Sequence, residues 1–277
     1  MIIIEAGSTH TKVCPIIDHK IGQIERYPGI NPNYMTDEAI YTILVDCLGH
    51  LPKNTEVYYY GTGCASLEIQ DRMKYFIHDR FDLSHVYVYS DLLASARATA
   101  QGEAGQINIL GTGSASCIYD GAFITRILPN IGYLFGDHGS GYKIGYSLLQ
   151  AYFDNLLDTK AQTVIESYSK MKKDVLLRYI YSSDSKSKIA SYAQCAHQLK
   201  DHDSVNALIS NEFETFINKQ IKLNKDYRTY NQYFSGSIAA YFESELKNSL
   251  NKHDLSIMKI CKDPIKELCK FHLTYSQ

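Results

Sequence analysis

The sequence predicts an α/β protein of two duplicated domains, each with a mixed sheet flanked by helices, and with a cleft between them. Short runs of β-forming residues alternate with helical patterns along most of the chain. A turn of glycine and hydroxyl residues follows the first apolar run, at Gly7-Ser8-Thr9, and a similar turn recurs at Gly111-Thr112-Gly113-Ser114. Each turn lies in the first hairpin of a predicted meander, which indicates an internal repeat.

The first part of the chain predicts a meander followed by alternating helices and strands. Thr36 or Asp37 is a suitable cap for the first helix, because each offers a side-chain oxygen to free amides. The expected elements are strands at 2–5, 11–17 and 21–27, a helix from Asp37, a strand at 57–60, a helix at 65–80, a strand at 86–89 and a helix at 92–101. We expect residues 1–102 to form the N-terminal domain.

The rest of the chain repeats the meander and then becomes mostly helical. The expected elements are strands at 107–110, 116–119 and 123–127, helices from Gly141 to about residue 228, strands at 231–235 and 257–260, and a terminal helix from Pro264. We expect residues 103–277 to form a second domain with a helical insertion, whose terminal helix packs back on the first domain.

Composition favours a small-molecule partner. The 28 basic and 30 acidic residues nearly balance, so no electrostatic footprint for nucleic acid or an anionic membrane is expected. The opening Met-Ile-Ile-Ile-Glu lacks a basic leader, and no run of 18 apolar residues occurs, so we expect a cytoplasmic protein. The seven cysteines form no Cys-x-x-Cys pair, which fits reduced thiols rather than disulfides or a zinc site.

The glycine and hydroxyl turns are candidate phosphate sites. Backbone amides freed by glycine form concave donor groups that suit phosphate oxygens. An ordinary hairpin connection is the alternative for both turns. Neither turn matches the phosphate loop of P-loop proteins or the Rossmann fingerprint. Gly236-Ser237, at a strand-to-helix junction, either allows close packing or lies against an adenine or ribose.

Three polar residues are candidates for chemistry or substrate binding. Asp91 follows the strand at 86–89, where it either caps the next helix or acts as a catalytic carboxylate at the carboxyl edge of a sheet. Asp137 lies among glycines, where it either forms a turn or accepts two sugar hydroxyls. Asn31, before Pro32, is either a turn residue or a substrate amide.

These residues, in this order, resemble the BadF/BadG/BcrA/BcrD ATPase and N-acetylglucosamine kinase family, within the actin-like (ribonuclease H-like) fold of sugar kinases and acetate kinases. The segments that carry the resemblance are Glu5 to Lys12, Gly29 to Asn33, Tyr60 to Cys64, Ser90 to Ala96, Ile109 to Gly121, Gly132 to Gly145, Ser235 to Ala239 and Asp263 to His272. Residues 146–230 carry little of it.

The resemblance implies ATP-dependent phosphorylation of the 6-hydroxyl of an amino sugar, N-acetylglucosamine or a relative such as N-acetylmuramic acid. Asp91 would accept the hydroxyl proton, and Mg²⁺ would lie near Glu5. The implied substrate residues are Asn31, Gly113 and Asp137, and the implied nucleotide residues are Gly7, Ser8, Thr9, Gly111, Thr112, Ser114, Gly236 and Ser237. Dimers are common in the family, so the resemblance leaves the oligomeric state open between a monomer and a homodimer.

Four residues depart from the family pattern. Glu5 stands where the family has Asp, His10 where it has Lys or Arg, Ala115 where Asn is common, and His138 where it has Glu. They motivate a second hypothesis, a non-catalytic sensor that binds sugar or nucleotide. A third hypothesis is an ATPase that activates a partner enzyme through a shared iron–sulfur cluster, for which no convincing cysteine motif is present.

Overall fold

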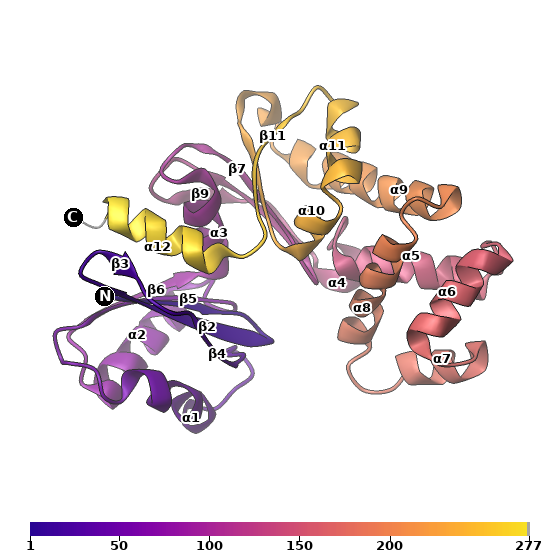
Figure 1. Cartoon of the computed structure of the whole chain (residues 1–277). Coiled ribbons are helices and arrows are strands. Elements are labelled where there is room, and N and C mark those ends of the chain that lie inside the picture. Colours follow the sequence, from indigo (N-terminus) through magenta and orange to yellow (C-terminus); the bar gives the residue numbers. More distant parts are fainter. Residues whose placement is uncertain (276–277) are drawn as a thin grey trace. The chain divides into compact units, whose positions relative to one another are not determined.

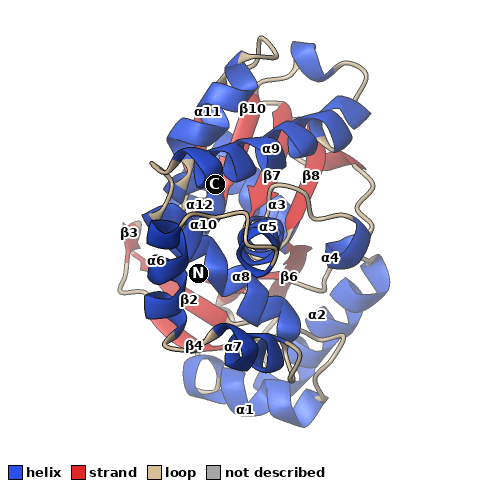
Figure 2. Ribbon diagram, turned by 90° about the vertical axis from the view of Figure 1, so that its right-hand side faces the viewer, coloured by secondary structure: helices blue, strands red, loops and turns tan. Residues whose placement is uncertain are grey.

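The computed structural model describes residues 1–275 and confirms the predicted α/β class. The chain divides into two compact units, each built on one mixed sheet (Figure 1). Unit 1 comprises Met1–Glu103, Asp120–Ile124 and the C-terminal segment that starts at Asp263, and unit 2 comprises Ala104–Tyr119 and Thr125–Lys262. Helices flank the strands of both sheets (Figure 2).

The sheet of unit 1 has the strand order β3-β2-β1-β5-β6, with β4 also paired to β2. Its elements are β1 (Ile2–Ala6), β2 (His10–Ile17), β3 (Lys20–Ile21), β4 (Glu25–Pro28), α1 (Asp37–Leu48), β5 (Glu56–Gly61), α2 (Leu67–Phe81), β6 (His85–Ser90), α3 (Asp91–Ala100) and α12 (Pro264–Tyr275). Strand β1 is antiparallel to β2 and parallel to β5, which is parallel to β6.

The prediction of one strand over 21–27 is wrong, because β3 and β4 are separate strands that both pair with β2. The break lies opposite Pro15, which has no N–H to donate to a ladder. Gly22 bends there, and its amide donates to the Pro15 carbonyl at 2.8 Å.

Side chains of the central strands alternate between two packed faces. On one face, Ile4, Val57 and Tyr59 are buried with the apolar side of α1 and α2. On the other face, Tyr60 and its neighbours meet α3 and α12, and α12 also packs against β1 and β2 (Figure 1). Thr36 caps α1 by accepting from the Ala39 amide, as predicted. The segment after each parallel strand is thereby held between two helical layers.

The sheet of unit 2 has the order β11-β10-β7-β8-β9. Its elements are β7 (Gly105–Leu110), β8 (Ser114–Tyr119), β9 (Ile124–Ile127), α4 (Gly132–Phe135), α5 (Gly141–Phe153), α6 (Thr159–Ser169), α7 (Lys173–Ile180), α8 (Ser185–Gln198), α9 (Asp203–Lys219), short 3₁₀ turns at Ile221–Leu223 and Tyr227–Thr229, β10 (Gln232–Ser235), α10 (Ser237–Tyr241), α11 (Glu243–Asn251) and β11 (Ile257–Cys261). The antiparallel β7–β8 hairpin with parallel β10 repeats the arrangement of β1, β2 and β5.

Helices α5 and α8 pack very closely in unit 2. A Cβ atom at Gly145 of α5 would lie 2.0 Å from the backbone oxygen of Ile189 in α8, so only glycine permits this approach. The contact fixes α8 beside the start of α5, where Gly141 follows the predicted glycine-rich segment. None of the described helices is both long and apolar enough to cross a membrane.

Candidate active site

The carboxyl ends of β1, β5 and β6 lie side by side at one edge of the unit 1 sheet. Their parallel registers align Ala6 with Gly61 and Gly61 with Ser90. The next residues along the chain therefore form a row: the Gly7-Ser8-Thr9 turn, Thr62 and Asp91. The Thr62 amide donates to the Ala6 carbonyl at 2.8 Å, which ties two of these segments together. This edge is where sheets of this kind bind ligands.

Asp91 is not the cap of α3. Ser90 has that role, because its hydroxyl accepts from the Leu93 amide at 3.2 Å. The Asp91 carboxylate instead accepts hydrogen bonds from the Thr62 hydroxyl, the Leu92 amide and its own backbone amide. The residue is exposed at the surface, yet the protein packed around its carboxylate raises the pKa of Asp91, and these three hydrogen bonds partly oppose that rise. The capping alternative is thus removed, and the side chain is available for chemistry.

Glu5 lies in β1 opposite Lys12 of β2. The Lys12 ammonium is 3.2 Å from Glu5 Oε2 and 2.9 Å from Asp263 Oδ1, just before α12. Burial raises the pKa of Glu5, while Lys12 opposes the rise. His10, where a basic residue was expected from the resemblance, is exposed at the start of β2.

Glu5 would serve a metal without a cage of protein ligands. No group of three or more His, Cys, Asp or Glu side chains among residues 1–275 is arranged to hold a metal ion. Mg²⁺ bound with phosphates commonly uses one or two carboxylates and water, and needs no protein cage. Glu5 fits that limited requirement because only Lys12 donates to it within the described chain.

The turn at Gly7 to Thr9 is packed against the loop that carries Asn31. A Cβ atom at Gly29 would lie 2.3 Å from the Ser8 backbone oxygen, and the Ile30 amide donates to the Gly7 carbonyl at 3.1 Å. Asn31 Oδ1 accepts from the Asn33 amide at 3.1 Å, so the residue does form a turn. Its side-chain NH₂ group is the part left for a ligand. The loop that carries Asn31 and the first turn are therefore held together within unit 1.

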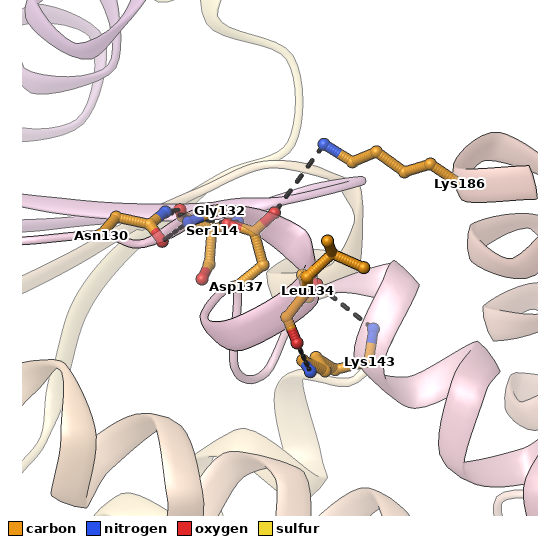
Figure 3. A network of polar contacts seen from close by, with 8 residues as sticks. Ser114, Asn130, Gly132, Leu134, Asp137, Lys143 and Lys186 are labelled. Carbon is orange, nitrogen blue, oxygen red and sulfur yellow. Dashed lines mark hydrogen bonds and ion pairs between the residues drawn. The ribbon is translucent and has the colours of Figure 1, made fainter. Parts of the chain in front are cut away.

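In unit 2, Asp137 holds the second glycine turn (Figure 3). Its Oδ1 accepts from the Ser114 amide at 3.2 Å and from Asn130 Nδ2 at 2.8 Å. Its Oδ2 lies 3.8 Å from the Lys186 ammonium. Asp137 has a φ of 52°, a backbone conformation that aspartate tolerates in turns. Asp137 starts a turn, because the Ser140 amide donates to its carbonyl at 3.2 Å, and its binding of a sugar stays a prediction. Its Oδ2 atom has no hydrogen bond within the described chain.

A cavity of about 540 Å³ opens beside the second turn within unit 2. It brings together the predicted nucleotide residues Gly111, Thr112 and Ser237. Ser114 and Gly236 do not line it. Gly236, at a φ of 103°, instead supports close packing, because a Cβ atom there would lie 2.4 Å from the Leu110 carbonyl oxygen.

Sequence reasoning missed the far wall of this cavity. One face of α8, together with α10 and the residue after it, supplies Ala190, Ser191, Ala193, Gln194, His197, Gln198, Ile238, Tyr241 and Phe242, with Gly141 from α5. The lining has no Lys, Arg, Asp or Glu, and its rings include the His197–Tyr241 pair, with centroids 5.5 Å apart. Such a wall suits a flat, uncharged ring, while the glycine turn offers amides. The sequence signal for this wall was the helical spacing of small and polar residues in α8. Ordinary surface helices show the same spacing, so it could not identify a binding site.

Neither a model of a known protein family nor the sequence of a curated protein matches this chain. Solved structures do match. A Porphyromonas gingivalis protein whose assignment as an N-acetylglucosamine kinase is itself provisional is 23% identical, with all of both chains covered and a TM-score of 0.91. A Chromobacterium violaceum protein with the same provisional assignment is 13% identical over 98% of both chains, with a TM-score of 0.73.

A third match is a ROK family glucokinase from Streptomyces griseus in complex with glucose and AMPPNP. It is 12% identical over 98% of this chain and 97% of the other, with a TM-score of 0.63. Identities this low establish the fold alone. The actin-like fold that the resemblance implied is confirmed.

Proposed function

We propose that this chain, which has the actin-like fold of sugar kinases, transfers the γ-phosphoryl group of ATP to the 6-hydroxyl of an amino sugar. N-acetylglucosamine or a relative such as N-acetylmuramic acid is the expected acceptor. The observation that carries the proposal is Asp91, a surface residue at the carboxyl edge of three parallel strands, with Thr62 between it and the Gly7 to Thr9 turn.

In the proposed reaction the sugar 6-oxygen forms a bond to the γ-phosphorus while the bond from that phosphorus to the β,γ-bridging oxygen breaks and ADP leaves. Asp91 accepts the hydroxyl proton. A loose transition state demands positioning and charge neutralisation more than strong base catalysis. Burial raises the pKa of Asp91, which moves it toward the working pH of a general base.

The remaining predicted residues divide between nucleotide and sugar. Gly111, Thr112 and Ser237 would hold the nucleotide in the unit 2 cavity, with Ser114 and Gly236 shaping the backbone beneath. The turn of Gly7, Ser8 and Thr9 would bind the terminal phosphates, with Ser8 and Thr9 as donors, because the Gly7 amide already donates to the His10 carbonyl at 2.9 Å. Asn31, Gly113 and Asp137 would orient the sugar, Asp137 through its Oδ2 atom.

Glu5 would hold Mg²⁺ through one carboxylate oxygen, and the ion would supply positive charge to the phosphate oxygens. Lys12 keeps the Glu5 carboxylate in place through the 3.2 Å contact. Its ammonium also provides a permanent positive charge on the strand that begins with His10.

A sensor without turnover is the second candidate, and one observation favours it: the carboxylate expected at the metal is already paired with Lys12. The third hypothesis, an ATPase that shares an iron–sulfur cluster with a partner, is not supported by the cysteines. All seven are buried, so none presents a thiolate at the surface for a shared cluster.

Incubation of the purified protein with Mg-ATP and a panel of amino sugars tests the proposal through ADP release. We expect sugar-stimulated release that falls about 10² to 10⁴-fold in Asp91→Asn. Asp71→Asn, which removes an exposed carboxylate of α2, is the matched control and should retain activity. Sugar binding by calorimetry without any sugar-stimulated ADP would establish the sensor instead, and activity unchanged in Asp91→Asn would refute the assignment of the base.

A further inference from the structure

Lys186, in the first turn of α8, reaches toward Asp137 (Figure 3). Its side chain is 40% exposed, whereas that of Asp137 is 5% exposed. The pair therefore presents its cation, not its carboxylate, to solvent. A ligand that approaches Asp137 meets the ammonium group of Lys186 at the same place.

The pairing leaves hydrogen-bonding capacity on both partners. Lys186 Nζ and Asp137 Oδ2 are 3.8 Å apart, which is too long for a hydrogen bond. Asp137 Oδ1, by contrast, already accepts from Ser114 and Asn130. A hydroxyl bound at Oδ2 would place the substituent on the neighbouring carbon within reach of Lys186.

Besides Asp137, an aromatic ring lies near Lys186. Its ammonium lies 5.2 Å from the centre of the Tyr133 ring in α4. Ile131, Leu134 and Phe135 beside it are exposed, and none of the side chains of α4 is buried. Helix α4 is held instead by polar contacts: Asn130 accepts from the Gly132 amide, and Lys143 donates to the Leu134 carbonyl. A half-exposed cation beside an aromatic ring suits a substituent that has both an alkyl part and one negative charge.

We propose that Lys186 is a specificity-determining residue that selects an amino sugar with a carboxylate-bearing substituent next to the hydroxyl that Asp137 accepts. The inference rests on the proposed function, since it extends the same sugar site. One ammonium matches the single charge of a carboxylate, whereas it would leave a phosphate dianion half neutralised. Asp137 is the only carboxylate paired with Lys186 in the described part of the chain, and at 3.8 Å it does not hydrogen-bond to the ammonium group.

The test compares N-acetylmuramic acid with its methyl ester, which lacks the negative charge and carries one additional methyl group. We expect the wild-type protein to prefer the acid, and Lys186→Gln to reduce kcat/KM for the acid about tenfold or more relative to the ester. Lys188→Gln is the matched control, because Lys188 bonds to Tyr179 and Ser182 and should leave the ratio of acid to ester unchanged. Equal losses for acid and ester in Lys186→Gln would mean that Lys186 only supports Asp137, which overturns the proposal.

Calorimetry separates this proposal from the kinase proposal. If no sugar is phosphorylated but the wild-type protein binds the acid more tightly than the ester, and Lys186→Gln loses that preference, the selectivity stands and the kinase proposal fails. If sugars are phosphorylated but acid and ester bind the wild-type protein equally, the kinase proposal stands and the proposed role of Lys186 in substrate specificity fails.

Discussion

Gly113 lies directly against the carboxylate of Asp137, so that a Cβ atom at residue 113 would be 2.7 Å from Asp137 Oδ2. The second glycine turn and the carboxylate that holds it are thus fitted to each other with no space for a side chain. This fit sets both the hydrogen bond from the Ser114 amide to Asp137 Oδ1 and the position of Asp137 Oδ2.

Gly113→Ala should push the Asp137 carboxylate away from the Ser114 amide. We expect the free energy of unfolding to fall by about 1–3 kcal/mol, as for other overpacked sites. Gly111→Ala is the control, since the nearest atom to its Cβ would be the Gly113 carbonyl oxygen at 4.0 Å, and its change should stay within about 0.5 kcal/mol. Urea unfolding measures both. If Gly113→Ala were as stable as wild type, Asp137 would be able to move without loss of folding free energy.

Gly236→Ala should be more damaging, because two problems combine. The residue has a φ of 103°, and a methyl group would lie 2.4 Å from the Leu110 carbonyl oxygen, which cannot move without disturbing β7. Strained backbone and overpacking each cost about 1–3 kcal/mol, so we expect a loss of several kcal/mol in urea unfolding. Ser237→Ala, at the exposed next position, should change stability little. A mild effect of Gly236→Ala would contradict the packing described for this junction.

Elements with local signals could be predicted from the sequence. The turns at Gly7 and Gly111 follow apolar runs, and Asp91 follows a strand of β-branched and aromatic residues, so each could be placed at a strand end. Their alignment at one edge follows from parallel pairing. The choice between Ser90 and Asp91 as the cap could not be made, because both residue types cap helices and only the backbone geometry decides.

Contacts between distant segments could not be predicted. The α8 wall of the unit 2 cavity comes from residues 190–198, far in sequence from Gly111, and its polar surface resembles that of any solvated helix. Lys12 meets Asp263 only because α12 returns to the sheet of unit 1. Helix α4 lacked a signal because its four residues bury no side chain.

Asp91→Asn should stabilise the protein at neutral pH while it removes activity. Because the folded-state pKa of Asp91 is raised, the native protein binds a proton more tightly than the unfolded chain does. The free energy of unfolding therefore falls as the pH rises through the interval between the two pKa values. An uncharged amide removes this cost, so the variant should unfold at a higher urea concentration than wild type at pH 7, and the difference should shrink as the pH is lowered.

Ser90→Ala provides the contrast at the neighbouring position. Loss of the cap on α3 should destabilise the protein by about 1 kcal/mol at every pH, because no ionisable group changes. A destabilised Asp91→Asn variant at pH 7 would mean that the bonds from Thr62 and Leu92 to the charged carboxylate outweigh its burial.

His272 should make the protein sensitive to mild acid. The side chain is 2% exposed, its Nε2 lies 2.8 Å from the Tyr60 hydroxyl, and Arg97 donates to the same hydroxyl at 2.7 Å. Burial and then the Arg97 charge lower the pKa of His272 to about 3. The unfolded chain takes up a proton near pH 6.5, whereas the folded protein does not, so stability is lost as the pH falls below that value. Between pH 7 and pH 5 this one group should lower the free energy of unfolding by about 2 kcal/mol.

His272→Gln tests this pH dependence, since glutamine keeps a polar group for Tyr60 and cannot be protonated. Its free energy of unfolding should fall less than that of wild type between pH 7 and pH 5, by about 2 kcal/mol. His85→Gln, at an exposed position at the start of β6, should follow the wild-type curve. All other histidines are common to the wild type and the His272 variant, so their contribution cancels in the comparison. If the free energies of unfolding of wild type and His272→Gln changed in parallel with pH, His272 would be protonated as readily in the folded protein as in the unfolded chain. The contact between α12 and Tyr60 would then open in acid before the protein unfolds.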